Sequence, residues 1–221
     1  MYFQKAAIGR AKRERTRGVI IDSAIEAFSK EGISGARVSS IAEQAGITGA
    51  TFYKHFRDKD ELTAATAAAI ILEVNRTIAD KIEPIDDPVI RVTALCSCVL
   101  KVLLNQKKWA SIVVDSFHYL REIRDEITQI MREQIEEGIA RGKFKAELND
   151  FLIEQLASLI MSSIRNQMQA GYSERNSELT CEHILRLLGL SSSAAAKAVE
   201  KWRPQFNTLA LPLPGFQPDE D

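Results

Sequence analysis

The sequence has few of the residues that interrupt helices. Only six prolines occur among 221 residues, at positions 84, 88, 204, 212, 214 and 218, so residues 1–83 and 89–203 contain none. Because proline breaks the interior of a helix, these two stretches can hold long helices. Alternating runs of Val, Ile and Thr, which are typical of strands, are absent. The sequence therefore predicts an all-α fold.

Cysteine and long apolar runs are also scarce. The three cysteines are an odd number, and Cys96 and Cys98 lie two apart on an expected helix and point to different faces, so we predict buried thiols. No uninterrupted apolar run approaches the ~18 residues of a membrane span, and no signal peptide is recognisable. The 29 Lys and Arg nearly balance the 30 Asp and Glu, which by itself indicates no polyanionic partner. We expect a cytoplasmic protein with no membrane contact.

Helical periodicity predicts roughly nine to ten helices. They are expected at 17–31, as a compact pair within 37–56, and at 58–81, 89–105, 108–141 (one or two helices), 149–170, 177–188 and 192–202. Four of the six prolines and an acidic end follow Trp202, which predicts an extended tail at 204–221. The first four residues look like the end of a cleavage tag and are left out of the fold prediction.

Residues 38–56, VSSIAEQAGITGATFYKHF, have the spacing of two short helices that cross at a turn. Gly46 permits the left-handed backbone that such a turn needs, and Thr48 is a good cap for the second helix. The small shared core would consist of Ile41, Ala45, Ile47, Phe52 and Phe56. Gly49, Ala50, Tyr53 and Lys54 then face outward. The pattern predicts a helix-turn-helix, whose second helix enters the major groove of DNA, with a purely structural helical hairpin as the alternative.

The run at 45–62, AGITGATFYKHFRDKDEL, closely resembles the signature of the TetR family of bacterial transcriptional regulators. The likeness extends back to the helix that contains Ala24 and Phe28, whereas the rest of the chain resembles the family only in length and helical character. The resemblance implies a dimeric regulator. Each subunit would have a three-helix DNA-binding head and a larger domain that binds a small effector and pairs the subunits.

The resemblance also implies DNA contacts for individual residues. Phosphate contacts are implied for Thr51, Tyr53, His55 and Lys59, and positions at or near base edges for Thr48, Gly49, Ala50 and Lys54. Lys59, with the free amides at the start of the following helix, offers a cation and donors to a phosphate oxygen.

Three positions depart from the family pattern. Arg37 and Ser39 stand where the family often has Thr and Arg, and both are predicted to be DNA-binding residues, with Arg37 supplying a phosphate contact. We expect Ser39 or Ser40 to cap the helix, with Glu43 completing a capping box from Ser40. Gly49 stands where Lys is frequent. Base readout would then rest on methyl contacts and DNA shape.

The balanced charge is an average of two unlike parts. Residues 1–60 hold 11 Lys or Arg against seven Asp or Glu, a net of +4, and residues 61–221 hold 18 against 23, a net of -5. Residues 1–17 alone contain six basic residues and one acidic residue, Glu14. This basic segment is predicted to lie along DNA, with a solvated tail as the alternative.

The second half of the chain offers candidates for pairing and for ligand binding. Apolar residues on two sides of the helix at 149–170 predict one inward face and one partner face, although a fully buried core helix would look the same. Dimer contacts are predicted for Leu152, Leu156, Leu159, Ser163, Ile184, Leu185 and Leu188. Effector contacts, or else plain core packing, are predicted for Trp109, Phe117, Met131, Met161, Arg165, Asn166 and Met168. Asp115, His118 and Glu122 share one face, but an exposed ion pair explains them as well as a metal, so no metal and no cofactor are predicted.

Together these patterns predict three parts: a helix-turn-helix DNA-binding domain at 10–57, an effector-binding and dimerisation domain at 58–203, and the tail at 204–221. The predicted function is that of a ligand-responsive repressor, released from a palindromic operator by a small molecule. A helical adaptor without DNA binding is one alternative. A helical enzyme is another, but the three His show no nucleophile–base pairing and no phosphate loop is visible.

Overall fold

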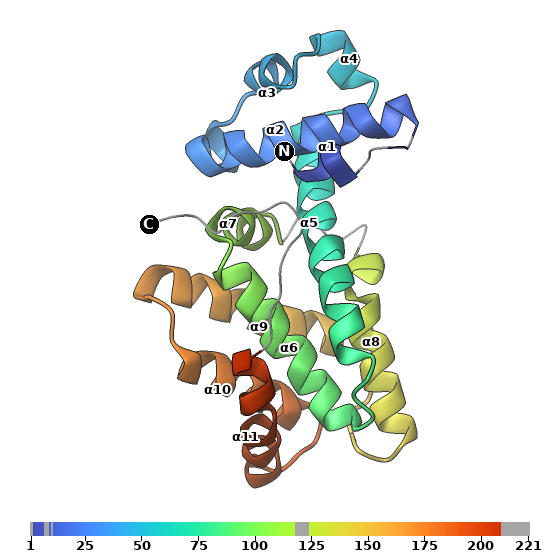
Figure 1. Ribbon diagram of the computed structural model, residues 1–221, viewed down its shortest axis with the longest axis vertical. Coiled ribbons are helices and arrows are strands. Elements are labelled where there is room, and N and C mark those ends of the chain that lie inside the picture. Colours follow the sequence, from blue (N-terminus) through green and yellow to red (C-terminus); the bar gives the residue numbers. More distant parts are fainter. Residues whose placement is uncertain (1, 7–8, 10, 118–123, 209–221) are drawn as a thin grey trace. The chain divides into compact units, whose positions relative to one another are not determined.

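The computed structural model describes residues 2–6, 9, 11–117 and 124–208, and all regular structure in them is helical (Figure 1). No strand occurs in these residues, so the all-α prediction is confirmed. The eleven helices are α1 (Tyr2–Ala6), α2 (Lys12–Gly35), α3 (Val38–Gln44), α4 (Gly49–Tyr53), α5 (Lys59–Ile82), α6 (Pro88–Leu104), α7 (Lys107–Ser116), α8 (Arg124–Ala140), α9 (Asp150–Ala170), α10 (Glu174–Leu187) and α11 (Ser192–Thr208).

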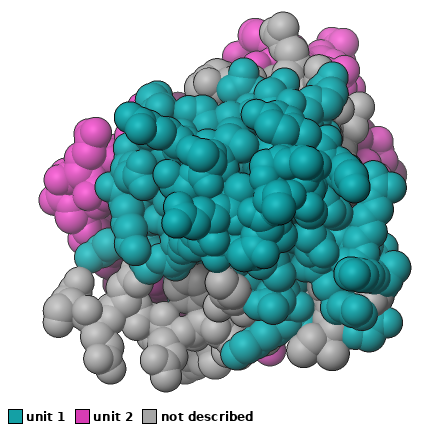
Figure 2. All heavy atoms as spheres, turned by 90° about the horizontal axis from the view of Figure 1, so that it is seen from above, with its two compact units in different colours: residues 1–71, 106–122, 213–221 teal, residues 72–105, 123–212 magenta. Residues whose placement is uncertain are grey.

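The chain forms two compact units, which Figure 2 colours separately. The first unit holds α1–α4, the start of α5 as far as Ile71, and α7. The second holds the rest of α5 from Leu72, then α6 and α8–α11. The predicted domain boundary after residue 57 stays a prediction. The division into units places α7, which comes later in the sequence, with the helices of the head.

A single apolar core closes the head within the first unit. Residues from α2, α3, α4, α5 and the segment between α4 and α5 meet there with almost no solvent exposure: Ile20, Ala24, Phe28, Ile41, Phe52, Phe56 and Leu62. Burial of each large side chain contributes roughly 1.5–3 kcal/mol, and this sum holds helices as short as α3 and α4, which are marginal alone. Helix α2 is longer than predicted and is kinked at Gly32, where φ is +71°.

Residues 2–4, which look tag-like in the sequence, belong to the fold. They form the start of α1, which packs against α2, and their three backbone amides donate hydrogen bonds to the carboxylate of Asp22. Setting them aside was wrong because periodicity cannot reveal a five-residue helix that a distant carboxylate holds in place.

In the second unit, α6 packs against α8, α9, α10 and α11. Cys96 and Cys98 of α6 and Cys181 of α10 are buried and free, as predicted. Burial raises the pKa of Cys98 to about 12 and that of Cys181 to about 11, so these thiols stay protonated at neutral pH. They act as small apolar side chains.

Helix α11 corrects the predicted tail. The helix continues through Pro204 to Thr208, whereas an extended segment was expected from residue 204. Val199 and Trp202 are buried just before the proline, and α11 packs on α6 and α10. Tertiary packing thus outweighs the one backbone hydrogen bond that a proline removes.

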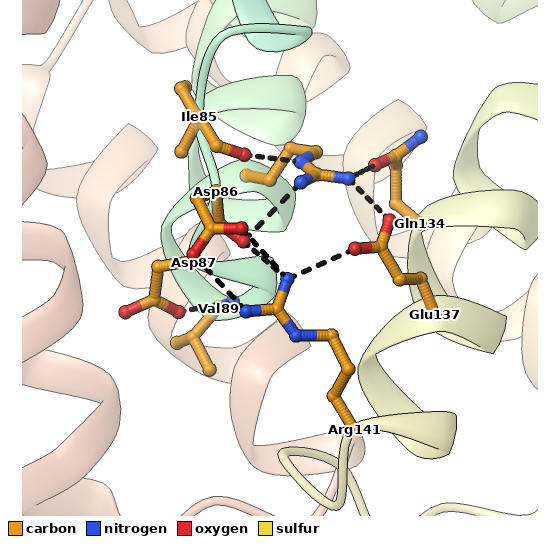
Figure 3. A network of polar contacts seen from close by, with 8 residues as sticks. Ile85, Asp86, Asp87, Val89, Gln134, Glu137 and Arg141 are labelled. Carbon is orange, nitrogen blue, oxygen red and sulfur yellow. Dashed lines mark hydrogen bonds and ion pairs between the residues drawn. The ribbon is translucent and has the colours of Figure 1, made fainter.

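The corner where α5 ends and α6 begins is joined to α8 by a network of polar contacts (Figure 3). Arg141 donates to the backbone and carboxylate oxygens of Asp86 and to Glu137. Arg91 donates to the carbonyl of Ile85 and to Glu137. The hydrogen bonds from Arg141 hold the pKa of Glu137 below its ordinary value. Because α8 carries Glu137 and Arg141 follows it directly, the corner at Pro84–Pro88 is fixed to that helix.

By length and hydropathy, α5 passes as a membrane span, as does the bent pair of α6 and α7. The α5 window is 44% buried inside the chain, and helices of soluble proteins can pass the same test of length and hydropathy. The helix also carries Glu73, Arg76 and Asp80. These features are those of a core helix.

Candidate nucleic-acid interface

The turn between α3 and α4 has the backbone that the sequence predicts. Gly46 has φ of +67°, its amide donates to the carbonyl of Glu43, and the amide of Ile47 donates to the carbonyl of Ala42, each at 3.0 Å. This pair of hydrogen bonds is a Schellman motif, which ends a helix with glycine in the left-handed region. The motif turns the chain sharply into α4.

Helix α4 starts as predicted at a threonine cap. The Thr48 hydroxyl accepts a hydrogen bond from the amide of Thr51 at 3.2 Å, and the two threonine hydroxyls lie 3.0 Å apart. Phe52 is buried against Phe56, with ring centroids 5.8 Å apart. The inward aromatic pair fixes which side of α4 faces solvent.

The outward side of α4 is the predicted reading face. Thr48, Gly49, Ala50 and Lys54 are exposed, and the Tyr53 side chain is 61% exposed. At the start of α3, Arg37 and Ser39 are exposed as well, while Thr51, His55 and Lys59 are half-buried. The fold therefore leaves most of the candidate DNA contacts open.

The predicted cap of α3 is wrong. The helix begins at Val38 with Arg37 at the cap position, and no side chain accepts a hydrogen bond there. The carbonyl of Arg37 already accepts from the amide of Ile41, so Ser39 and Ser40 lie inside the helix rather than at its end. Helix α3 therefore starts earlier than the Ser40–Glu43 capping pattern predicts.

Lys59 is engaged inside the chain. Its ammonium donates to the carbonyls of Ile33, Ser34 and Ala36 at 2.9, 3.1 and 3.2 Å. These carbonyls lie around the C-terminal end of α2, where a helix carries partial negative charge. Three acceptors match the three protons of an ammonium group. The phosphate contact stays a prediction, and it would require at least one of these bonds to break.

His55 lies beside the basic start of α2. Burial lowers its pKa, and the nearby charges of Arg13 and Arg17 lower it further. The guanidinium of Arg17 also lies over the Phe56 ring, 4.9 Å from its centroid. Two of the six basic residues at the N-terminus thus stand next to the end of the reading helix, and their contact with DNA stays a prediction.

The predicted effector residues divide between the two units, and their role in ligand binding stays a prediction. Trp109 and Phe117 belong to the first unit, and the other five belong to the second. Trp109 and Met131 are buried, Phe117 and Met161 are half-buried, and Arg165, Asn166 and Met168 are exposed. A cavity of about 20 Å³ in the second unit, beside Ser97, Ser177 and Trp202, holds none of them and has room for about one water molecule.

The predicted dimer residues are mostly buried within the chain itself. Leu152, Leu156, Ile184, Leu185 and Leu188 are buried, and Leu159 and Ser163 are half-buried. Large apolar side chains are instead exposed at Phe151, Met168, Tyr172 and Leu187. The alternative that the sequence left open, a fully buried core helix, does not describe α9, because Phe151 and Met168 are exposed, and the dimer contacts stay predictions. Of the possible metal ligands, His118 and Glu122 lie outside the described residues.

Comparison with known proteins decides the family. The family model described as "Bacterial regulatory proteins, tetR family" matches residues 20–66, which run from α2 into α5. The chain belongs to the TetR family. The transcriptional repressor NicS of Pseudomonas putida is 24% identical over 158 residues, which are 67% of this chain and 74% of NicS. The regulator SrpR of Pseudomonas putida is 42% identical over 59 residues, which are 27% of this chain and 28% of SrpR.

Solved structures extend the TetR likeness to most of the chain. RolR in complex with resorcinol has a TM-score of 0.72 at 21% identity and covers 86% of this chain and 95% of its own. FadR of Bacillus subtilis in complex with stearoyl-CoA has a TM-score of 0.62 at 20% identity, with coverages of 78% and 98%. At these identities the likeness establishes the fold. With the helix-turn-helix and the family match, it makes this chain a DNA-binding transcriptional regulator.

Proposed function

We propose that this protein is a homodimeric repressor that binds a palindromic operator and is released from it by a small-molecule effector. The observation that carries the proposal is the exposed face of α4. Its apolar side is closed by Phe52 and Phe56, while Tyr53 and Lys54 remain open to solvent. A helix presented in this way fits the major groove. The relative NicS bears the name of a repressor, which supports the sign of regulation.

Sequence discrimination by this face rests on few side-chain hydrogen bonds. Gly49 has no side chain and Ala50 offers only a methyl group, which suits contact with the methyl group of thymine. Tyr53 supplies a phenol that is suited to a phosphate oxygen, and Lys54 supplies a cation that can lie near a base edge and also face a phosphate. DNA shape and deformability therefore carry much of the specificity.

Pairing of two copies is proposed through α9 and α10. These helices are joined by a short loop and pack on each other. Phe151 is 68% exposed and Leu187 46%, toward the end away from the loop, and Met168 and Tyr172 are exposed at the loop end. Exposed aromatic and aliphatic groups at both ends of one helical hairpin are typical of an interface. A second copy would cover them.

An effector is proposed to act from within the larger helical part of the chain. RolR and FadR, which share the fold, were solved with an aromatic diol and an acyl-CoA respectively. These ligands differ widely, so the fold alone does not select a chemical class. An effector releases the protein from DNA only if it binds the DNA-free arrangement more tightly than the DNA-bound one.

The DNA part of the proposal is tested with promoter fragments from beside the protein's own gene. Fluorescence anisotropy at low salt should show saturable binding that survives excess nonspecific DNA. Tyr53→Ala should weaken binding to operator and nonspecific DNA alike, because the phenol addresses phosphate. Ala196→Glu, at an exposed position of α11 outside the head, is the control. Absence of binding at low salt would reject the proposal and favour the adaptor.

The pairing is tested by sedimentation velocity. Leu187→Glu should shift the protein to monomer, because it places a charge in the apolar face, whereas Ala196→Glu should leave a dimer. If both variants remain dimeric, the interface lies elsewhere.

The effector is tested by native mass spectrometry of the purified protein and by a screen for compounds that raise its melting temperature. A compound that binds should also lower operator affinity. A compound that binds tightly and leaves operator affinity unchanged would reject release as the mechanism.

A further inference from the structure

The carboxylate of Asp22 in α2 holds the first helix. Its Oδ1 accepts hydrogen bonds from the amides of Tyr2 and Phe3, both at 2.9 Å, and its Oδ2 accepts one from the amide of Gln4 at 2.8 Å. Asp22 is only 5% exposed. The first amides of a helix have no partner within the helix, and a buried carboxylate that satisfies three of them makes a set of charge-assisted hydrogen bonds.

Aromatic contacts join α1 to α7 as well. The ring centroid of Trp109 in α7 lies 5.6 Å from that of Tyr2 and 5.9 Å from that of Phe3. Trp109 is fully buried and Tyr2 nearly so. The side chains of α1 therefore cover Trp109, and the backbone of α1 is fastened to α2.

A glycine in α2 makes the close approach possible. A Cβ atom at Gly18 would lie 2.7 Å from the carbonyl oxygen of Phe3 and 2.9 Å from its carbonyl carbon. Glycine is a poor residue for the interior of a helix, and Gly18 has no left-handed backbone that would call for it. The contact with the α1 backbone supplies the physical reason for glycine at this position.

We propose that Tyr2–Ala6 form an N-terminal strap that fastens α2 to α7, with Asp22 as the positioning residue. The strap braces the first half of α2, whose Arg13 and Arg17 stand beside His55 at the end of the reading helix. Its release would loosen both the start of α2 and the cover over Trp109. The operator-binding consequence rests on the proposed function. The ion pair of Glu26 with Lys108, at 3.4 Å, is a second link between α2 and α7 that does not involve the strap.

Tryptophan fluorescence tests whether the strap is seated. The chain has two tryptophans, so Trp202→Phe leaves Trp109 as the single emitter. In that background, Asp22→Asn and Phe3→Ser should shift the emission to the red and increase quenching by acrylamide. Glu26→Gln, which removes the second link, should leave both signals unchanged. Equal quenching in all four proteins would overturn the strap.

Gly18→Ala gives an independent test that needs no change at either tryptophan. In the full-length wild-type background the added methyl group meets the Phe3 backbone, so the melting temperature should fall. In the Asp22→Asn background the strap is already released, and alanine should raise the melting temperature because it favours the helix. The same shift in both backgrounds would contradict the strap.

Operator affinity tests the positioning role. Asp22→Asn should weaken operator binding at a temperature where the variant is fully folded, and the salt dependence should not change, since no phosphate contact is removed. If quenching of Trp109 rises and operator affinity stays at the wild-type value, the strap has no positioning role. Failure of the wild-type protein to bind operator would reject the proposed function, while the Trp109 and Gly18 measurements would still decide the strap.

Discussion

Replacing Lys59 with Met separates two roles that this residue can have. Methionine keeps the length and apolar stem of lysine and removes the charge and all three donors. The structure shows those donors bound to three carbonyls at the end of α2. The family resemblance implies instead a contact with DNA phosphate. The two roles predict different changes in stability and in the salt dependence of binding.

The expected loss of stability follows from the three hydrogen bonds. A hydrogen bond to a charged group contributes roughly 1.5–3 kcal/mol, but Lys59 is only half-buried and water can replace part of the loss. We therefore expect Lys59→Met to lower the free energy of unfolding by about 1–3 kcal/mol in total. For a unit of this size, each kcal/mol corresponds to about 4–8 °C in melting temperature.

Operator affinity is then measured by anisotropy between 50 and 200 mM salt, a range in which phosphate contacts lose much of their strength. Each phosphate contact contributes about 0.9 to the slope of log affinity against log salt. Because its charge is held by carbonyls, Lys59→Met should leave the slope near the wild-type value. Lys54→Met is the matched control, since Lys54 is exposed on the reading face. That variant should lower the slope by about 0.9 per head and leave the melting temperature unchanged.

The opposite pattern would refute this reasoning. If Lys59→Met lowers the slope as much as Lys54→Met and unfolds at the wild-type temperature, the bonds to the carbonyls contribute nothing. Lys59 would then act on phosphate, as the resemblance implies.

Three further substitutions test the turn, the histidine and the second unit. Gly46→Val should destabilise the head by at least about 1–2 kcal/mol because φ at this position is +67°. Gly46→Asn, which tolerates this backbone, should retain operator binding. Equal denaturation midpoints for the two variants would contradict the turn. His55 has a pKa below its usual 6.5 through burial and the charges of Arg13 and Arg17, so the unfolded chain takes up the proton first. Stability should be complete above pH 6.5 and fall below it, and His55→Gln should remove that part of the pH dependence. Gly138→Ala should cost roughly 1–3 kcal/mol in chemical denaturation, because its Cβ would overlap the Phe144 ring; wild-type stability would show that the ring moves freely.

Helix ends that are set by a single capping residue or glycine could be predicted from the sequence. The predicted helix at 149–170 differs from α9 by one residue, because Asn149 caps it through the amide of Leu152 and Gly171 ends it. The cap at Thr48 and the left-handed Gly46 were likewise readable from single residues. Helix α1 and the extension of α11 could not be predicted from single residues. Contacts with α2 hold α1 in place, and packing on α6 and α10 lets α11 continue through Pro204.

The functional surfaces were harder to predict for a specific reason. Two apolar stripes on α9 look equivalent in sequence, and only packing shows that Leu152 and Leu156 turn inward while Phe151 remains exposed. The acceptors of Lys59 lie 23–26 residues before it, and no spacing rule connects them. Sequence therefore predicted which side of α4 is exposed, because exposure follows from helix periodicity, and missed contacts between distant segments.

Three glycines in the head region show how the fold and a partner can be distinguished. Gly18 is required by the nearby Phe3 backbone, and Gly46 by its positive φ. Gly49 has neither reason: its φ is not positive, and an added Cβ would meet nothing within 4 Å among the described residues. It lies on the exposed side of α4, where we predict that a base edge approaches the chain. Gly49→Ala should therefore keep or raise the melting temperature, since alanine favours the helix by up to about 1 kcal/mol, while changing operator affinity or preference. Wild-type affinity and preference in this variant would show that the position lies away from the DNA.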